Sequence, residues 1–156
     1  MRFKRKRYGQ RLMLAPKSKT STPYALASQV GFILRRATQR HLTIFSERIS
    51  DLTPTQFAAL AMLNQLGPVS QNELGRRTAM DGATIKGVID RLRKRDLVSS
   101  APDPSDQRRI IVSLSPTGLD MVEGYINNAE AITADTLAPL SEKEQKTFLE
   151  LLWKLT

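Results

Sequence analysis

Residues 70–95, which read SQNELGRRTAMDGATIKGVIDRLRKR, decide the fold because they contain two helix starts separated by a short turn. Residues 70–73 (SQNE) have the pattern of a capping box and predict a short helix to about Thr78. Asp81 is typical of a second cap, for a helix over about 82–95 whose apolar residues recur at helical spacing. This order indicates a helix-turn-helix, whose second helix enters the major groove of DNA.

The hydrophobic period changes after this segment from that of a helix to that of strands. Residues 97–100 (LVSS) and 110–114 (IIVSL) are short runs typical of strands. Residues 102–109 (PDPSDQRR) lie between them and contain two prolines and several turn formers, so we expect an extended hairpin loop. A helix-turn-helix followed by such a hairpin predicts a winged helix.

Longer helices are predicted on both sides of the winged helix. Apolar residues step by three and four through residues 25–47, and residues 53–56 (TPTQ) begin a helix that ends near Gly67. Ser115 begins another long helix, and residues 141–144 (SEKE) begin the last one. We therefore expect one mostly α domain with a small β-hairpin over residues 22–156, its winged helix at about 53–115 and its flanking helices at about 22–48 and 116–156.

The positive charge of the chain is unevenly placed. The formal net charge is +9, but residues 1–19 contain eight Lys or Arg and no acid, while residues 70–109 contain nine basic and six acidic residues. We expect residues 1–21 to form a disordered basic arm. Contact with nucleic-acid phosphates is one interpretation of this arm. A solvated extension with no role, or residues upstream of a start at Met13, is the alternative.

The composition excludes several classes of protein. The chain has no cysteine, which excludes disulfides, thiolate metal sites and redox sensing through cysteine, and its single histidine, His41, excludes multi-histidine metal sites within one chain. No apolar run approaches the ~18 residues that cross a membrane. No phosphate-binding loop or nucleophile motif is present, so we expect that the protein is not an enzyme and has no cofactor or metal. We also expect a cytoplasmic protein.

The predicted second helix and the hairpin loop carry side chains suited to DNA. Thr84 and Lys86 can donate to bases or phosphates, and the methyl group of Ala83 can contact thymine. An ordinary solvated helix face is the alternative at these positions. Arg108 and Arg109, at the tip or descending side of the hairpin, suit a narrow minor groove, where a bidentate pair with Asp106 would hold an arginine in place; simple charge neutralisation by this aspartate is the alternative.

Two motifs in this region carry a resemblance to the MarR family of transcription regulators. The hairpin reads Asp106-Gln107-Arg108, followed by Leu114-Ser115 and Gly118, and the second helix contains residues 89–92 (IDRL). The resemblance covers about residues 25–155. It implies a homodimer, built from the first and the last two helices, that binds a pseudo-palindromic DNA operator. It also implies major-groove contacts from Thr84, Lys86 and Arg91, contacts nearer the DNA backbone from Asn72 and Arg76, and a wing contact from Arg108 with Arg109.

Many relatives in the family release DNA when a small aromatic acid binds between the dimer helices and the DNA-binding region. The residues to which the resemblance points here are Arg35, Arg36, Arg40 and His41. An arginine can clamp a carboxylate, and a histidine can bond a ring hydroxyl. Arg35 and His41 lie ~240° apart around a helix and would flank a ligand. The alternative is a histidine satisfied within the core, with Arg36 and Arg40 paired to acids across the dimer.

Two functions are therefore predicted. The first is a dimeric, sequence-specific repressor that a small aromatic carboxylate releases from its operator. The second is a nucleoid or RNA-associated protein that binds nucleic acid without sequence preference through the basic arm and the wing.

Overall fold

The structure, a computed structural model, describes residues 24–156, so the predicted basic arm at residues 1–21 lies outside the described residues. The fold is mostly helical with one small antiparallel sheet, as predicted. In chain order its elements are η1 Leu26–Ser28, α1 Val30–Arg48, α2 Pro54–Leu66, β1 Val69–Ser70, α3 Gln71–Arg77, α4 Gly82–Lys94, β2 Val98–Pro102, β3 Ile110–Leu114, α5 Pro116–Leu137 and α6 Glu142–Trp153.

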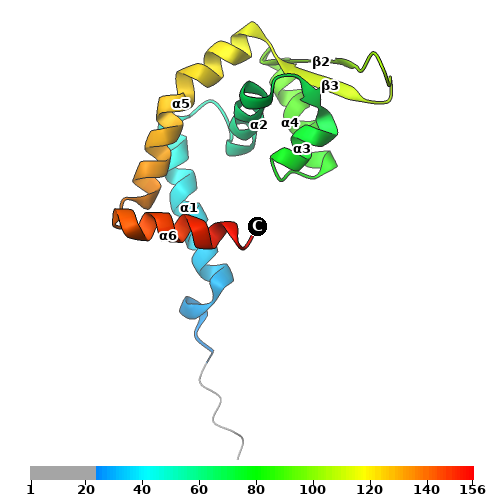
Figure 1. Ribbon diagram of the computed structural model, residues 1–156. Coiled ribbons are helices and arrows are strands. Elements are labelled where there is room, and N and C mark those ends of the chain that lie inside the picture. The colour runs from blue at the N-terminus through cyan, green and yellow to red at the C-terminus, as the bar shows by residue number, and fades with distance from the viewer. Residues whose placement is uncertain (1–23) are drawn as a thin grey trace, which may run out of the picture.

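The elements form two parts that are connected by the long helix α5 (Figure 1). Helices α1 and α5 run side by side, and α6 crosses α1; we call α1, α5 and α6 the stalk. Helices α2 to α4 and the three strands form the second part, residues 53–115, which we call the lobe. No helix among residues 24–156 is both long enough and apolar enough to cross a membrane.

The sheet has three strands in the order β1-β3-β2, although the sequence predicts only the β2–β3 hairpin. In β1, Val69 pairs with Val112 and Ser70 pairs with Ile111. Hairpin pairing puts Ser100 on the other side of Val112. A strand of two residues is too short to show an alternating pattern, which is why it escapes prediction.

Capping side chains fix the helix starts largely as the sequence predicts. Thr53 and Gln56 form the complete capping box of α2, and the carboxylate of Asp81 accepts the Thr84 N–H of α4 at 2.7 Å. Only half of the capping box predicted for α3 is present. The Ser70 hydroxyl accepts the Glu73 N–H at 3.3 Å, but the Glu73 carboxylate bonds to arginines of its own helix.

The first long helix begins later than predicted. Residues 25–47 have one continuous apolar stripe, but α1 starts at Val30 and a separate short helix, η1, precedes it. Gln29 has extended backbone angles, with φ −84° and ψ 129°, and interrupts the two. The apolar period alone does not show this break.

The main core lies in the lobe and continues into the base of the stalk. Leu60 and Leu63 of α2, Leu74 of α3 and Leu92 of α4 are almost fully buried there. Each such side chain contributes ~1.5–3 kcal/mol relative to an exposed one. The stalk is different, because α6 has no buried residue and α1 buries only Phe45.

Candidate functional site

The turn between α3 and α4 holds the two helices in tight contact. The N–H of Met80 donates to the carbonyl of Gly75 at 2.8 Å, and Ala79 takes a left-handed backbone with φ 52°. A Cβ on Gly75 would lie 3.0 Å from the Met80 carbonyl oxygen and 3.1 Å from Ile85, so a larger residue would push α3 away from α4. The orientation of α4 is thus fixed by its contact with α3.

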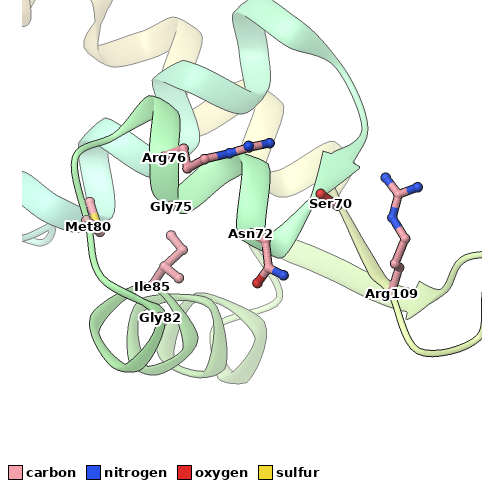
Figure 2. A pocket seen from close by; sticks show the side chains of 8 residues that line it. All are labelled: Ser70, Asn72, Gly75, Arg76, Met80, Gly82, Ile85 and Arg109. Carbon is pink, nitrogen blue, oxygen red and sulfur yellow. The ribbon is translucent and has the colours of Figure 1, made fainter.

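We call the β2–β3 hairpin, residues 98–114, the wing. A surface hollow of about 520 Å³ lies where α3, the turn between α3 and α4, α4 itself and the wing meet. Figure 2 shows Ile85 pointing from α4 toward α3, and Arg109 standing on the wing at the other side of the hollow. Three predicted DNA-contacting residues, Asn72, Arg76 and Arg109, line it together with Ser70, Gly75, Met80, Gly82 and Ile85.

The predicted contact residues of α4 lie on its exposed surface. Ala83, Thr84, Lys86 and Arg91 are all exposed, while the apolar stripe of the same helix is buried. The ammonium group of Lys86 donates to Asp90 at 2.9 Å, and the same carboxylate accepts from Arg93. The hydrogen bond from Lys86 lowers the pKa of Asp90. The positive charge of this face is therefore partly balanced by an acid of its own.

A similar arrangement occurs on α3. Arg76 and Arg77 both donate to the carboxylate of Glu73, the latter at 2.8 Å. These bonds, that from Arg77 first, lower the pKa of Glu73. Asn72 is exposed one position earlier, toward the hollow. Solvent screens surface pairs of this kind, so they add little to stability and leave the two guanidinium groups available to an anionic partner.

The wing presents its arginines to solvent. The side chain of Arg108 is 91% exposed, and its Nε donates to Asp106 at 3.1 Å. The same carboxylate oxygen also accepts the Arg108 N–H at 3.1 Å. The contact is thus a single side-chain bond and not the bidentate pair expected from the sequence. Arg109 lies 3.7 Å from the carboxylate of Asp103, whose pKa is lowered by hydrogen bonds from Ser105.

A second, largely apolar pocket of about 330 Å³ lies in the stalk among α1, α5 and α6. His41 lines it, is half-buried, and lies 3.0 Å through Nδ1 from the Thr136 hydroxyl. The other lining residues are Leu34, Ala37, Thr38, Thr133, Leu137, Phe148, Leu149 and Leu152.

The predicted effector residues are only partly brought together. Arg35, Arg36 and Arg40 are exposed and do not line the stalk pocket. The guanidinium of Arg36 stacks 5.9 Å from the ring centre of Phe32, and Arg40 donates to the carbonyl of Asp135 at 2.8 Å. Arg40 thus bonds to the residue that precedes Thr136 of the pocket, whereas Arg36 is held against its own helix.

Sequence reasoning did not select the threonines of the stalk pocket. Thr38, Thr133 and Thr136 supply hydroxyl groups there. Their signal in the sequence is weak: a threonine on a mostly apolar helix face is usual in a core and identifies no ligand. Among residues 24–156 no group of three or more potential metal ligands comes together.

Comparisons with known proteins agree with this geometry. A family model described as MarR family matches residues 52–110. The transcriptional repressor NicR of Pseudomonas putida is 42% identical, over 86% of this chain and 87% of its own length. A probable transcriptional regulator from Pseudomonas aeruginosa is 51% identical, with a TM-score of 0.81 over 85% of this chain and 100% of that chain.

A third relative is BpsR of Bordetella bronchiseptica, whose DNA binding is regulated by 6-hydroxynicotinic acid. Its structure is 41% identical in sequence, with a TM-score of 0.82 over 86% of this chain and 97% of that chain. These relatives are regulators of transcription and not enzymes. With its winged helix, its exposed α4 face and this extent of identity, the chain belongs to the MarR family of transcription regulators.

Proposed function

We propose that this transcription regulator is a homodimer that represses transcription from a pseudo-palindromic operator and is released by a small aromatic carboxylate. The effector class that we propose is a hydroxylated pyridine carboxylate, as for BpsR. The observation that carries this proposal is the largely apolar stalk pocket with His41 and three threonines as its polar groups.

Exposed apolar side chains on the stalk support a dimer. Val30 and Ile33 of α1 are 65% and 51% exposed, and Leu151 and Trp153 of α6 are 55% and 76% exposed. A soluble monomer rarely leaves so large an apolar surface in water. A second copy packed on α1 and α6 would bury these side chains.

For the operator, we propose that α4 enters the major groove, with Ala83, Thr84, Lys86 and Arg91 at base edges. Asn72 and Arg76 would bind the DNA backbone, and Arg108, oriented by Asp106, would enter the minor groove with Arg109 beside it. Exposure of every one of these side chains except the half-buried Asp106 supports the assignment. Two copies would address half-sites about one helical turn, ~34 Å, apart.

In the stalk pocket, we propose that the aromatic ring of the effector packs among the leucines and Phe148 while its polar groups meet His41 and Thr136. A volume of about 330 Å³ suits a small ligand. Arg40 is the arginine best placed for the carboxylate, because it already reaches the carbonyl of Asp135 beside the pocket. Neither Arg35 nor Arg36 lines the pocket in this structure, so each would have to change rotamer to reach a ligand there.

Release would follow from a shift between two arrangements of the dimer. The effector would favour an arrangement in which the two α4 helices no longer match successive major grooves. Thermodynamic linkage then requires that operator DNA weakens effector binding by the same factor by which effector weakens DNA binding.

The effector proposal can be tested with 6-hydroxynicotinate and purified protein. We expect the compound to raise the melting temperature and to release a duplex that wild-type protein has selected from a random pool. His41→Ala should retain affinity for this duplex and lose the response, while Gln39→Ala, an exposed position on the same helix, should behave as wild type. An unchanged response in His41→Ala would remove this histidine from the site, and unfolding of the variant would assign it to the core.

Competition with random duplex separates the repressor from a non-specific binder. A repressor should bind its selected duplex about 10³-fold or more tightly than random duplex at physiological salt. Equal affinity for both would exclude sequence-specific repression and favour non-specific binding. A sedimentation measurement that finds only monomers would exclude the proposed dimer.

A further inference from the structure

Three polar side chains connect the end of α4 to the stalk. Arg95, the C-cap residue directly after α4, donates through Nη1 to the backbone carbonyl of Asp51 at 2.6 Å. Its Nη2 lies 3.4 Å from Oδ2 of the same aspartate. Asp51 belongs to the short connection between α1 and α2, so one guanidinium joins α4, the proposed recognition helix, to the segment that follows α1.

The same aspartate is also bonded to α5. The hydroxyl of Tyr125, on α5, donates to the other carboxylate oxygen of Asp51, Oδ1, at 2.6 Å. This hydrogen bond raises the pKa of Tyr125, so the phenol keeps its proton and remains a donor. One carboxylate therefore receives Arg95 on one side and Tyr125 on the other.

Helix α1, which ends just before Asp51, and helix α5, which bonds to Asp51 through Tyr125, also line the stalk pocket. His41 on α1 and Thr136 on α5 lie 3.0 Å apart in its wall. Tyr125 precedes Thr136 by eleven residues, which is ~16 Å along α5. Between these ends the helices are held together by the ion pair of Arg48 with Asp135 and by a hydrogen bond from Asn128 to the carbonyl of Arg48.

We propose that Arg95, Asp51 and Tyr125 form a joint that transmits a change in the packing of α1 against α5 to the recognition helix. The inference rests on the proposed effector pocket, and it assigns to three residues a positioning role that is distinct from contact with DNA or effector. In this proposal, an effector bound at His41 and Thr136 changes how α1 packs against α5. Asp51 lies three residues after the end of α1, so such a change would either break its bond to Tyr125 in the middle of α5 or displace Arg95 and the end of α4 with it.

A role in stability alone explains the joint less well. The side chains of Arg95 and Asp51 are 36% and 41% exposed, and solvent screens an ion pair with such exposure so that it adds little to folding stability. Their geometry is nevertheless specific, because three separate elements meet at one aspartate within hydrogen-bonding distance. Their loss should therefore change how the lobe is oriented more than whether it folds.

The test measures coupling between 6-hydroxynicotinate and DNA. For each variant, the affinity for the selected duplex is measured with and without saturating compound, and the ratio of the two dissociation constants is the coupling factor. The variants are Tyr125→Phe, which removes only the hydroxyl, and Arg95→Met, which keeps an unbranched side chain. Their matched controls are Tyr24→Phe, at an exposed tyrosine, and Lys94→Met, which removes the neighbouring positive charge.

We expect the coupling factor to fall by about fivefold or more in both joint variants and to stay at the wild-type value in both controls. The affinity for 6-hydroxynicotinate without DNA should not change, because neither residue lines the pocket. Wild-type coupling in Tyr125→Phe and Arg95→Met would overturn the proposal. A decrease in effector affinity as large as the decrease in coupling would also overturn it.

A wild-type protein that shows no response to the compound would contradict the effector proposal and not the joint. In that case affinity for the selected duplex decides. Tyr125→Phe should bind it about fivefold more weakly than Tyr24→Phe if the joint orients α4, and equal affinity would overturn the positioning role.

Discussion

Gly118 at the start of α5 lies so close to the carbonyl oxygen of Leu97 that a Cβ on this glycine would be 1.9 Å from it. Ser115, the residue that caps α5, joins the start of this helix to residues 96–97 as well, because its hydroxyl donates to the carbonyl of Asp96 and accepts the N–H of Gly118. The Ser and Gly positions of the family motif thus have a packing role: they attach α5 to the segment that leads from α4 into the wing.

Gly118→Ala should destabilise the protein by about 3 kcal/mol or more, because the added methyl group meets backbone that cannot move aside. Chemical denaturation measures the change. Gly124→Ala, on the same helix but with nothing within 4 Å of its added Cβ, is the matched control. It should stabilise the protein by ~0.5–1 kcal/mol through helix propensity. Similar stabilities for the two variants would contradict the close contact.

Ala79→Gly should stabilise the protein by up to about 1 kcal/mol, because Ala79 has φ 52° and glycine removes the cost of a left-handed backbone. Thermal unfolding measures it. Asp96 has φ 55°, but aspartate tolerates this conformation better, so Asp96→Gly should gain less. A destabilised Ala79→Gly would show that flexibility of the unfolded chain outweighs the strain.

Arg108→Ala should cost ~1–3 kcal/mol of binding to the selected duplex if this side chain enters the minor groove. Fluorescence anisotropy at fixed salt measures the affinity. Lys146→Ala, at an exposed position on α6, removes a charge far from the wing along the chain and should leave the affinity unchanged. An Arg108→Ala protein that binds as tightly as wild type would remove this arginine from the interface.

Deletion of residues 1–19 should flatten the salt dependence of DNA binding if the eight basic residues of this segment bind phosphates. The slope of log K against log salt should decrease by about 0.9 for each phosphate that the segment neutralises. Binding to random duplex over a range of salt concentrations measures this slope. An unchanged slope would assign the segment no role in DNA binding.

The parts of the fold that the sequence predicts are those that depend on near neighbours. Thr53 and Asp81 cap helices a few residues away, so their patterns are readable without the fold. The strand β1 and the break at Gln29 are not readable, because partner strands and packing decide them.

The same distinction between near and distant neighbours decides which parts of the candidate site can be predicted from the sequence. The exposed face of α4 follows from its own buried stripe, so Thr84 and Lys86 can be selected from periodicity and chemistry. The direction in which Arg36 points does not follow from periodicity, because it depends on the ring of Phe32. Tyr125 and Asp51 are separated by 74 residues, and no local pattern relates them.

The pairing of β1 with β3 has a consequence for the DNA sequence that the protein can read. Because Val69 and Ser70 pair with the central strand of the sheet, β1 connects the start of α3 directly to the wing, and we expect the two to keep a fixed relative position. In the proposed complex with the operator, the helical phase between the major-groove contacts of α4 and the minor-groove contact of Arg108 would then be constant. One base pair inserted within a half-site should therefore abolish recognition, whereas only the stalk could accommodate a change in the spacer between the two half-sites.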